Sequence, residues 1–178
     1  VMLGDVDRQQ SSRQWLAMRP AHLPPILGWE LSHNEIVRPP KGTTHVVLDT
    51  PAGLHGKKLD VVVKSIHRVI VPLQPSIFDI LATRAFLDEL LEEKAVRNQK
   101  TFIAVVGMRV DARTRAAHEL ERFLEGLDVP VLGFLRDTQV YVQAAAHGLT
   151  LFDQSPARAA QDLPQWQGII DWVDAPHE

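Results

Sequence analysis

The sequence contains no cysteine. Disulfide frameworks, thiolate zinc sites, iron–sulfur clusters and cysteine nucleophiles are therefore excluded. No apolar stretch approaches the roughly 20 residues that a helix needs to cross a bilayer. With 178 residues, 45% of them hydrophobic, and a formal net charge of only −3, the chain is predicted to form one domain with a substantial core. The expected location is the cytoplasm.

Three motifs of common enzyme classes are also missing. There is no Gly-x-Ser-x-Gly elbow, and no two of the eight histidines form an i, i+4 pair on a predicted helix, so scattered surface or strand-end histidines explain them better than zinc. A phosphate-binding loop is absent too. Its nearest imitation, Gly53-Leu-His-Gly-Lys-Lys58, has two residues between the glycines instead of four and Lys58 in place of Ser or Thr.

Strand and helix patterns alternate along the chain. Apolar runs predict strands, and 3.6-residue spacing or capping residues predict helices. Strands are expected at 1–5, 44–49, 68–72, 101–107 and 129–135, and helices at 11–18, 57–65, 76–95 and 113–127. Residues 26–43 give no clear pattern. This alternation predicts an α/β fold in which a parallel sheet is covered by helices on both faces and all five strands end at one edge.

Local signals mark two helix starts. Ser11 or Ser12 can cap the helix that runs to Met18. Ser76 and Asp79 resemble a capping box in which Asp replaces Glu.

The strand at 44–49 ends on Asp49 and continues directly into Thr50-Pro51-Ala52-Gly53. Its apolar residues predict burial on both faces, which places Asp49 at the sheet edge where open α/β folds bind ligands. A carboxylate there can hold Mg²⁺, usually through water, and a Pro/Gly loop can move with the state of a phosphate. The alternative is a terminal Asp that only caps a turn.

Two neighbouring segments favour the ligand-binding interpretation. The opening strand ends in Asp5-Val-Asp7, which would emerge at the same edge, with the carboxylates of Asp7 and Asp49 close together in one cleft. The strand at 68–72 is broken by Pro72 and Pro75. Taken singly, Asp5 or Asp7 could simply solvate a strand terminus.

In their order and spacing, the three segments resemble the ParA/MinD group of deviant Walker P-loop ATPases, more closely the ParA side. The ParA-like pattern is hhhhDxDPQ, then hhhhDTPP/AG, then hhhPxQPS, where h is apolar. The resemblance extends from Val1 to about Asp153, and Arg8 departs from it where Pro is common. It implies a three-layer P-loop NTPase-like sandwich that uses ATP and Mg²⁺, and the lack of cysteine excludes the nitrogenase-iron-protein branch.

The family's Lys-Gly-Gly-x-Gly-Lys-Thr loop precedes the Asp-x-Asp segment, and no such run occurs here. We therefore expect residues 1–178 to be a single ParA-like domain downstream of its P-loop strand, loop and helix. Because the phosphate cradle is missing, these residues alone are expected neither to hydrolyse ATP nor to bind it tightly.

The resemblance also implies roles for individual residues. Asp7 would orient or activate the attacking water, Asp5 would support the site, and Asp49 would lie in the outer shell of Mg²⁺. Thr50, Pro51 and Gly53 would form switch II. At the base site Met108 stands where an Asn often reads adenine, so recognition would rest on Met108 and on backbone groups near Leu135 and Arg136.

The implied partners are a second, ATP-bound copy of the chain and non-specific DNA. The candidate DNA-binding residues are Lys94, Arg97, Lys100, Arg109, Arg113 and Arg115. The alternative for them is an ordinary solvated surface with pairs such as Arg115–Glu119. Membrane binding is disfavoured, because the tail is acidic, and we interpret Trp166, Ile169, Ile170 and Trp172 as core or dimer-face packing.

Two functions stay open at this point. One is partitioning of a chromosome or plasmid on the nucleoid with a ParB-like centromere-binding partner. The other is positioning of a protein cargo, such as a chemotaxis, flagellar or polysaccharide-export complex, through an adaptor protein.

Overall fold

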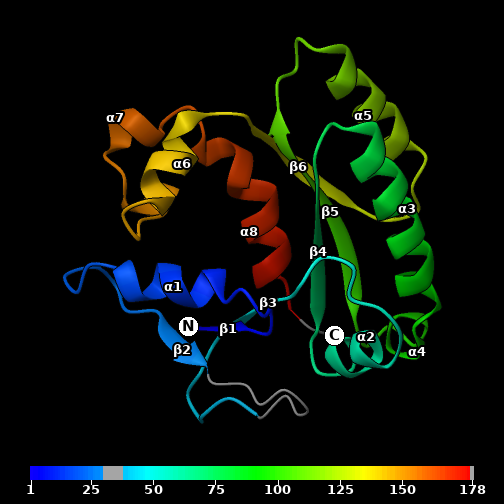
Figure 1. Ribbon diagram of the computed structural model, residues 1–178, viewed down its shortest axis with the longest axis horizontal. Coiled ribbons are helices and arrows are strands. Elements are labelled where there is room, and N and C mark those ends of the chain that lie inside the picture. The colour runs from blue at the N-terminus through cyan, green and yellow to red at the C-terminus, as the bar shows by residue number, and fades with distance from the viewer. Residues whose placement is uncertain (30–37, 177–178) are drawn as a thin grey trace. The chain divides into compact units, whose positions relative to one another are not determined.

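The computed structural model describes residues 1–29 and 38–176, and the chain divides into two compact units. Unit 1 comprises Val1–Leu54 and Gln139–Ala159. Unit 2 comprises His55–Thr138 and Ala160–Glu178. Each unit contains one three-stranded parallel sheet (Figure 1). Part of the unreadable stretch at 26–43 lies outside the described residues.

The sheet of unit 1 has the strand order β2-β1-β3. Its elements are β1 (Met2–Asp5), α1 (Ser11–Met18), β2 (Leu27–Trp29), β3 (Val46–Asp49), α6 (Gln139–Ala145), the 3₁₀ helix η1 (Leu151–Asp153) and α7 (Pro156–Ala159). Helix α1 packs on β1. The strand at 44–49 was expected to be buried on both faces, and this was wrong: Val47 is 55% exposed. β3 is an edge strand with one neighbour, so it has fewer atoms to cover it.

The sheet of unit 2 has the order β4-β5-β6. Its elements are α2 (Gly56–Val63), β4 (Arg68–Leu73), α3 (Ile77–Glu92), α4 (Lys94–Arg97), β5 (Phe102–Val110), α5 (Arg115–Glu125), β6 (Val131–Arg136), the 3₁₀ helix η2 (Leu163–Trp166) and α8 (Gln167–Asp174). The central strand supplies Ile103, Ala104, Val105 and Val106, all at most 6% exposed. Helices α3 and α5 lie on one face of this sheet and α8 on the other (Figure 1).

The α/β class and the parallel strand pairing are confirmed in both units. The five expected strands lie in two sheets that also include β2, so the single sheet of a three-layer P-loop sandwich stays an expectation. The interpretation of the tail as core is confirmed for Ile169, which is buried with Val106 and Leu135, and for Trp166, which packs against this cluster. No helix among residues 1–29 and 38–176 has the length and hydropathy of a membrane span.

Several local predictions were wrong. The helix expected over 76–95 is interrupted at Glu93, whose backbone is extended. Neither predicted serine cap forms: Gln10, in the left-handed region with φ 53°, precedes α1, and the Ser76 side chain makes no capping hydrogen bond. A cap does form at α5, where the Thr114 side chain accepts from the backbone of Ala117.

A buried ion pair connects the end of α1 to η1 within unit 1. The guanidinium of Arg19 donates to both carboxylate oxygens of Asp153, at 2.9 and 3.1 Å, and less than a tenth of either side chain is exposed. Hydrogen bonds from Arg19 and from Thr150 lower the pKa of Asp153 to about 2. Gly148 lies beneath the end of α1, where a Cβ atom would come within 2.6 Å of the Met18 carbonyl oxygen. The α1 end is therefore fixed by charge and by close packing together.

This pair predicts a specific acid sensitivity. Because the folded pKa of Asp153 is below its unfolded value, its contribution is complete above about pH 4 and is lost as the pH falls through about 2. Arg19→Met should lower the free energy of unfolding at neutral pH by about 2 kcal/mol and flatten its decline between pH 4 and 2. Urea unfolding across this pH range measures both effects.

Arg115→Met is the matched control, because it breaks an exposed i, i+4 pair with Glu119 that should contribute less than about 0.5 kcal/mol. If the free energy of unfolding of Arg19→Met still declined between pH 4 and 2 as steeply as that of the original protein, the stabilising role of the Arg19–Asp153 pair would be contradicted.

Candidate active site at the carboxyl ends of β1 and β3

The parallel register of β1 and β3 places Asp5 directly opposite Asp49. The backbone N–H of Val6 donates to the Asp49 carbonyl oxygen at 3.0 Å, which extends the pairing past the strand end. Two carboxylates predicted to share a sheet edge therefore do so in unit 1.

Ser12 connects these two carboxylates. Its hydroxyl donates to Asp49 Oδ2 at 2.6 Å, the short distance typical of a hydroxyl on an ionised carboxylate. Its backbone N–H donates to Asp5 Oδ2 at 3.0 Å, and that of Arg13 donates to the same oxygen at 3.3 Å. Asp5 thus takes over the capping of α1, while the side chain of Ser12 fixes the orientation of Asp49.

Sequence reasoning considered Ser12 only as a possible cap. A serine at the start of the helix that follows an Asp-ending strand was the available signal. Its partner, however, lies 37 positions away in sequence, and only the strand register identifies it.

Asp7 lies in a tight turn next to Asp5. Its backbone N–H donates to Asp5 Oδ1 at 3.0 Å, and its own Oδ1 accepts from Gln9 N–H at 3.0 Å. The Gln10 side-chain amide donates to the carbonyl oxygens of Asp5 and Asp7, at 3.2 and 3.3 Å. Asp5 is thus the more structural of the two carboxylates, and Asp7 makes the more exposed contact.

The adjoining recess differs from the expected cleft. It has a volume of about 510 Å³ and is lined by β1, β2 and α1. Asp5 contributes to its wall, whereas Asp7 and Asp49 do not. The lining residues are Leu3, Asp5, Gln10, Arg13, Leu16, Ala17, Gly28 and Trp29.

The candidate switch follows β3 without regular structure. Thr50 and Pro51 are partly buried and Gly53 is exposed. Gly53 has φ 73°, which favours glycine at this position.

The predicted base-site residues lie in unit 2, where their side chains pack internally. Leu135 is 2% exposed, and Met108 packs against its cluster. The Arg136 guanidinium pairs in a bidentate manner with Asp162, which is completely buried, and the Arg136 N–H donates to Gln165 Oε1 at 2.9 Å. In this structure, both side chains at the end of β6 serve the core and the link to η2.

The six candidate DNA-binding residues do not form one patch. Lys94, Arg97 and Lys100 precede β5, Arg109 is near its end, and Arg113 and Arg115 follow it, so most of the strand separates the two groups. All three arginines at the far end are paired with carboxylates. The pairs are Arg109–Asp137 at 3.2 Å, Arg113–Asp111 at 2.9 Å and Arg115–Glu119 at 3.0 Å.

One of these pairs has a clear electrostatic signature. Side-chain and backbone hydrogen bonds from Arg113 lower the pKa of Asp111 to about 2. For Arg115, the predicted alternative of a solvated pair with Glu119 is the one observed.

Among the described residues, no group of three or more histidine, aspartate or glutamate side chains is placed to hold a metal ion by itself. Asp49, whose Oδ2 accepts from Ser12, is the carboxylate at this edge that could help to hold Mg²⁺, an ion that uses one or two carboxylates while water and substrate phosphates supply its other ligands.

No family model matches the sequence. The chain is 28% identical over 182 aligned positions to the maintenance of carboxysome distribution protein A of Gloeobacter kilaueensis, and the match covers 98% of this chain and 80% of that protein. The chain is thus a distant homologue of this protein, and the match confirms at family level the ParA-type ATPase resemblance of the three motifs.

The different contacts of the two aspartates predict different effects on stability. Asp5→Ala removes the acceptor for three backbone N–H groups and should lower the free energy of unfolding by about 1–2 kcal/mol. Asp7→Ala removes one exposed contact and should cost about 0.5 kcal/mol or less. Urea denaturation of both variants measures these changes. Equal losses of unfolding free energy in the two variants would contradict the capping role of Asp5.

Proposed function

We propose that this chain is part of a ParA-like ATPase whose ATP-dependent dimerisation cycle positions a large protein cargo inside the cell. The observation that carries the proposal is the match along 98% of the chain to a protein named for carboxysome distribution. The paired Asp5 and Asp49, with Ser12 between them, support an ATPase site at this sheet edge. Non-specific DNA would be the surface on which the dimer moves, and an adaptor protein would connect it to the cargo.

The chemistry assigned to the site follows from the positions of the carboxylates. Bound ATP and Mg²⁺ would supply the phosphoryl group and neutralise its charge. Asp49, held by the Ser12 hydroxyl, would accept hydrogen bonds from water of the metal shell. Asp7, on its turn, would orient the attacking water. Thr50, Pro51 and Gly53 would report the loss of the γ-phosphate to the rest of the chain.

The function is tested by deleting the gene in its own host. We expect a large protein assembly, visible by electron cryotomography, to become clustered or unevenly distributed, while a chromosomal or plasmid marker is inherited at the normal rate. Complementation with the intact gene is the control. Frequent marker loss with normally distributed assemblies would contradict cargo positioning and favour DNA partitioning instead.

The two carboxylate roles are tested in the full-length protein. Asp7→Ala should leave ATP affinity within about threefold of the original and lower turnover by about 100-fold, because orienting the water matters mainly in the transition state. Asp49→Ala should weaken Mg²⁺-dependent ATP binding, because Asp49 would help to hold the metal in the ground state as well as in the transition state.

Equilibrium nucleotide binding and steady-state hydrolysis measure these effects. Glu119→Ala, which removes an exposed carboxylate on α5, is the control and should change neither. Equal loss of ATP binding in the Asp7 and Asp49 variants, or normal turnover in both, would show that this sheet edge is not the ATP site.

A further inference from the structure

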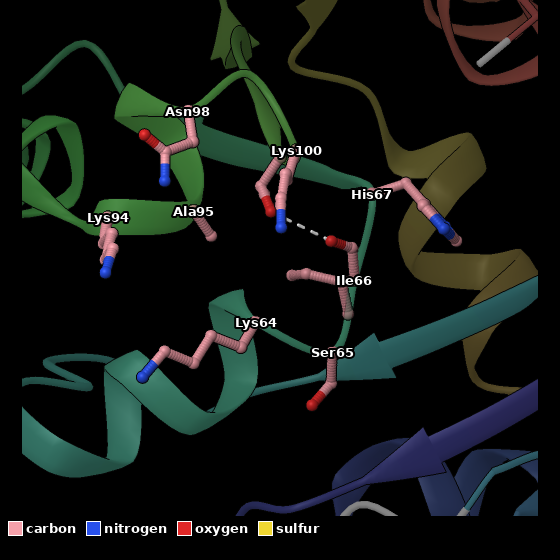
Figure 2. A pocket seen from close by; sticks show the side chains of 9 residues that line it. Lys64, Ser65, Ile66, His67, Lys94, Ala95, Asn98 and Lys100 are labelled. Atoms are coloured by element: carbon pink, nitrogen blue, oxygen red, sulfur yellow. Dashed lines mark hydrogen bonds between the residues drawn. The ribbon is translucent and has the colours of Figure 1, made fainter. Parts of the chain in front are cut away.

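A lysine-lined recess lies at the amino-terminal ends of β4 and β5, within unit 2 (Figure 2). Its volume is about 560 Å³, within the range of small-molecule sites. Three segments form it: the turn after α2, the short helix α4, and the start of β5. The lining residues are Lys64, Ser65, Ile66, His67, Lys94, Ala95, Asn98, Lys100 and Thr101, with neither a carboxylate nor a Phe, Tyr or Trp ring among them.

The floor of this recess is firmly tied together. The hydroxyl of Thr101, which is 2% exposed, lies 2.9 Å from the Val63 carbonyl oxygen and 3.0 Å from that of Ile66. The backbone N–H groups of Lys100 and Thr101 both donate to the Ala95 carbonyl oxygen. All three segments are therefore fixed to one another before any ligand arrives, which reduces the entropic cost of binding.

The lysines of the recess differ in whether they form ion pairs. Lys64 pairs with Asp60 at 2.6 Å, and burial together with Asp60 raises the pKa of the neighbouring Glu93. In the part of the chain that the structure describes, Lys94 and Lys100 form no ion pair. Both lysines are exposed, so their ammonium groups are accessible to a ligand.

Figure 2 shows Asn98 and Lys100 above the recess with their side chains directed down into it, Lys64 below with its side chain extending away along α2, and His67 directed away. Ammonium groups and an amide N–H are the donors that phosphate oxygens accept. No Phe, Tyr or Trp lines the recess and the His67 ring is directed away from it, which argues against recognition of a nucleobase by stacking (Figure 2).

We propose that this recess binds a small, multiply charged phosphate compound, through Lys94, Lys100 and Asn98. The site lies at the amino-terminal ends of β4 and β5 and uses none of the residues assigned to ATP. A free anion is favoured over the DNA backbone because Lys94, Lys100 and Asn98 line a recess of about 560 Å³, which a small anion can enter.

The test titrates inorganic pyrophosphate into the full-length protein without Mg²⁺, with calorimetry for affinity and NMR for location. Pyrophosphate should bind and shift the amide signals of Asn98, Lys100 and Thr101. The double variant Lys94→Gln, Lys100→Gln should bind pyrophosphate at least about tenfold more weakly than the original protein. Arginine at both positions should restore most of the affinity, because it keeps the charge.

The matched control is Lys57→Gln, Lys58→Gln, which removes the same charge from two exposed lysines of α2 outside the recess. It should bind pyrophosphate normally. Equally weakened pyrophosphate binding in both double variants would show general charge attraction and overturn the proposal, as would shifts of amide signals outside the recess.

A third measurement determines duplex DNA binding at the same ionic strength. Loss of DNA binding in the recess variant, without pyrophosphate binding by the original protein, would assign these lysines to DNA and overturn the proposal.

Discussion

The pairing of β1 with β3 is the constraint on which the candidate site depends. In a parallel pair, a shift of one residue turns every side chain to the other face, so the register that sets Asp5 opposite Asp49 also decides whether Ser12 can reach Asp49. The α1 helix is anchored by the same arrangement, since Asp5 accepts from its first turn. Strand register, helix start and carboxylate orientation are thus one cooperative unit rather than three separate features.

The sequence predicted elements well where one local signal dominated. The buried apolar runs became β4, β5 and β6, and the amphipathic segment after Arg113 became α5. Serine caps were predicted less well, because a cap depends on which acceptor reaches the N–H groups, and at α1 that acceptor comes from Asp5 on the preceding strand. Likewise, nothing near Arg136 in sequence indicates its buried partner Asp162, 26 positions further on.

The candidate DNA-binding residues show how sequence proximity can mislead. Lys94 to Arg115 is a short interval, but β5 runs through its middle and separates Lys94, Arg97 and Lys100 from the arginines at its carboxyl end. Carboxylates accompany the arginines after β5, which makes that end nearly neutral. At the other end, Lys64 lies 2.6 Å from Asp60 and Arg97 lies 3.9 Å from Glu92, whereas Lys94 and Lys100 form no ion pair among the described residues. Acidic partners therefore accompany cations at both ends of the strand, and Lys94 and Lys100 are the exceptions.

The turn from Asp5 to Gln10 explains how the chain tolerates Arg8 where relatives of the ParA type often have proline. Proline would fix one backbone angle in advance. Here hydrogen bonds to Asp5 and Asp7 fix the turn instead, with Gln10 closing it in the left-handed region. Oδ1 of the Asp7 carboxylate accepts the N–H of Gln9, and Oδ2 is the oxygen with which Asp7 would orient a water, since a carboxylate has acceptor sites on both oxygens. Under the proposed function, the turn therefore fixes the direction in which Asp7 presents that second oxygen.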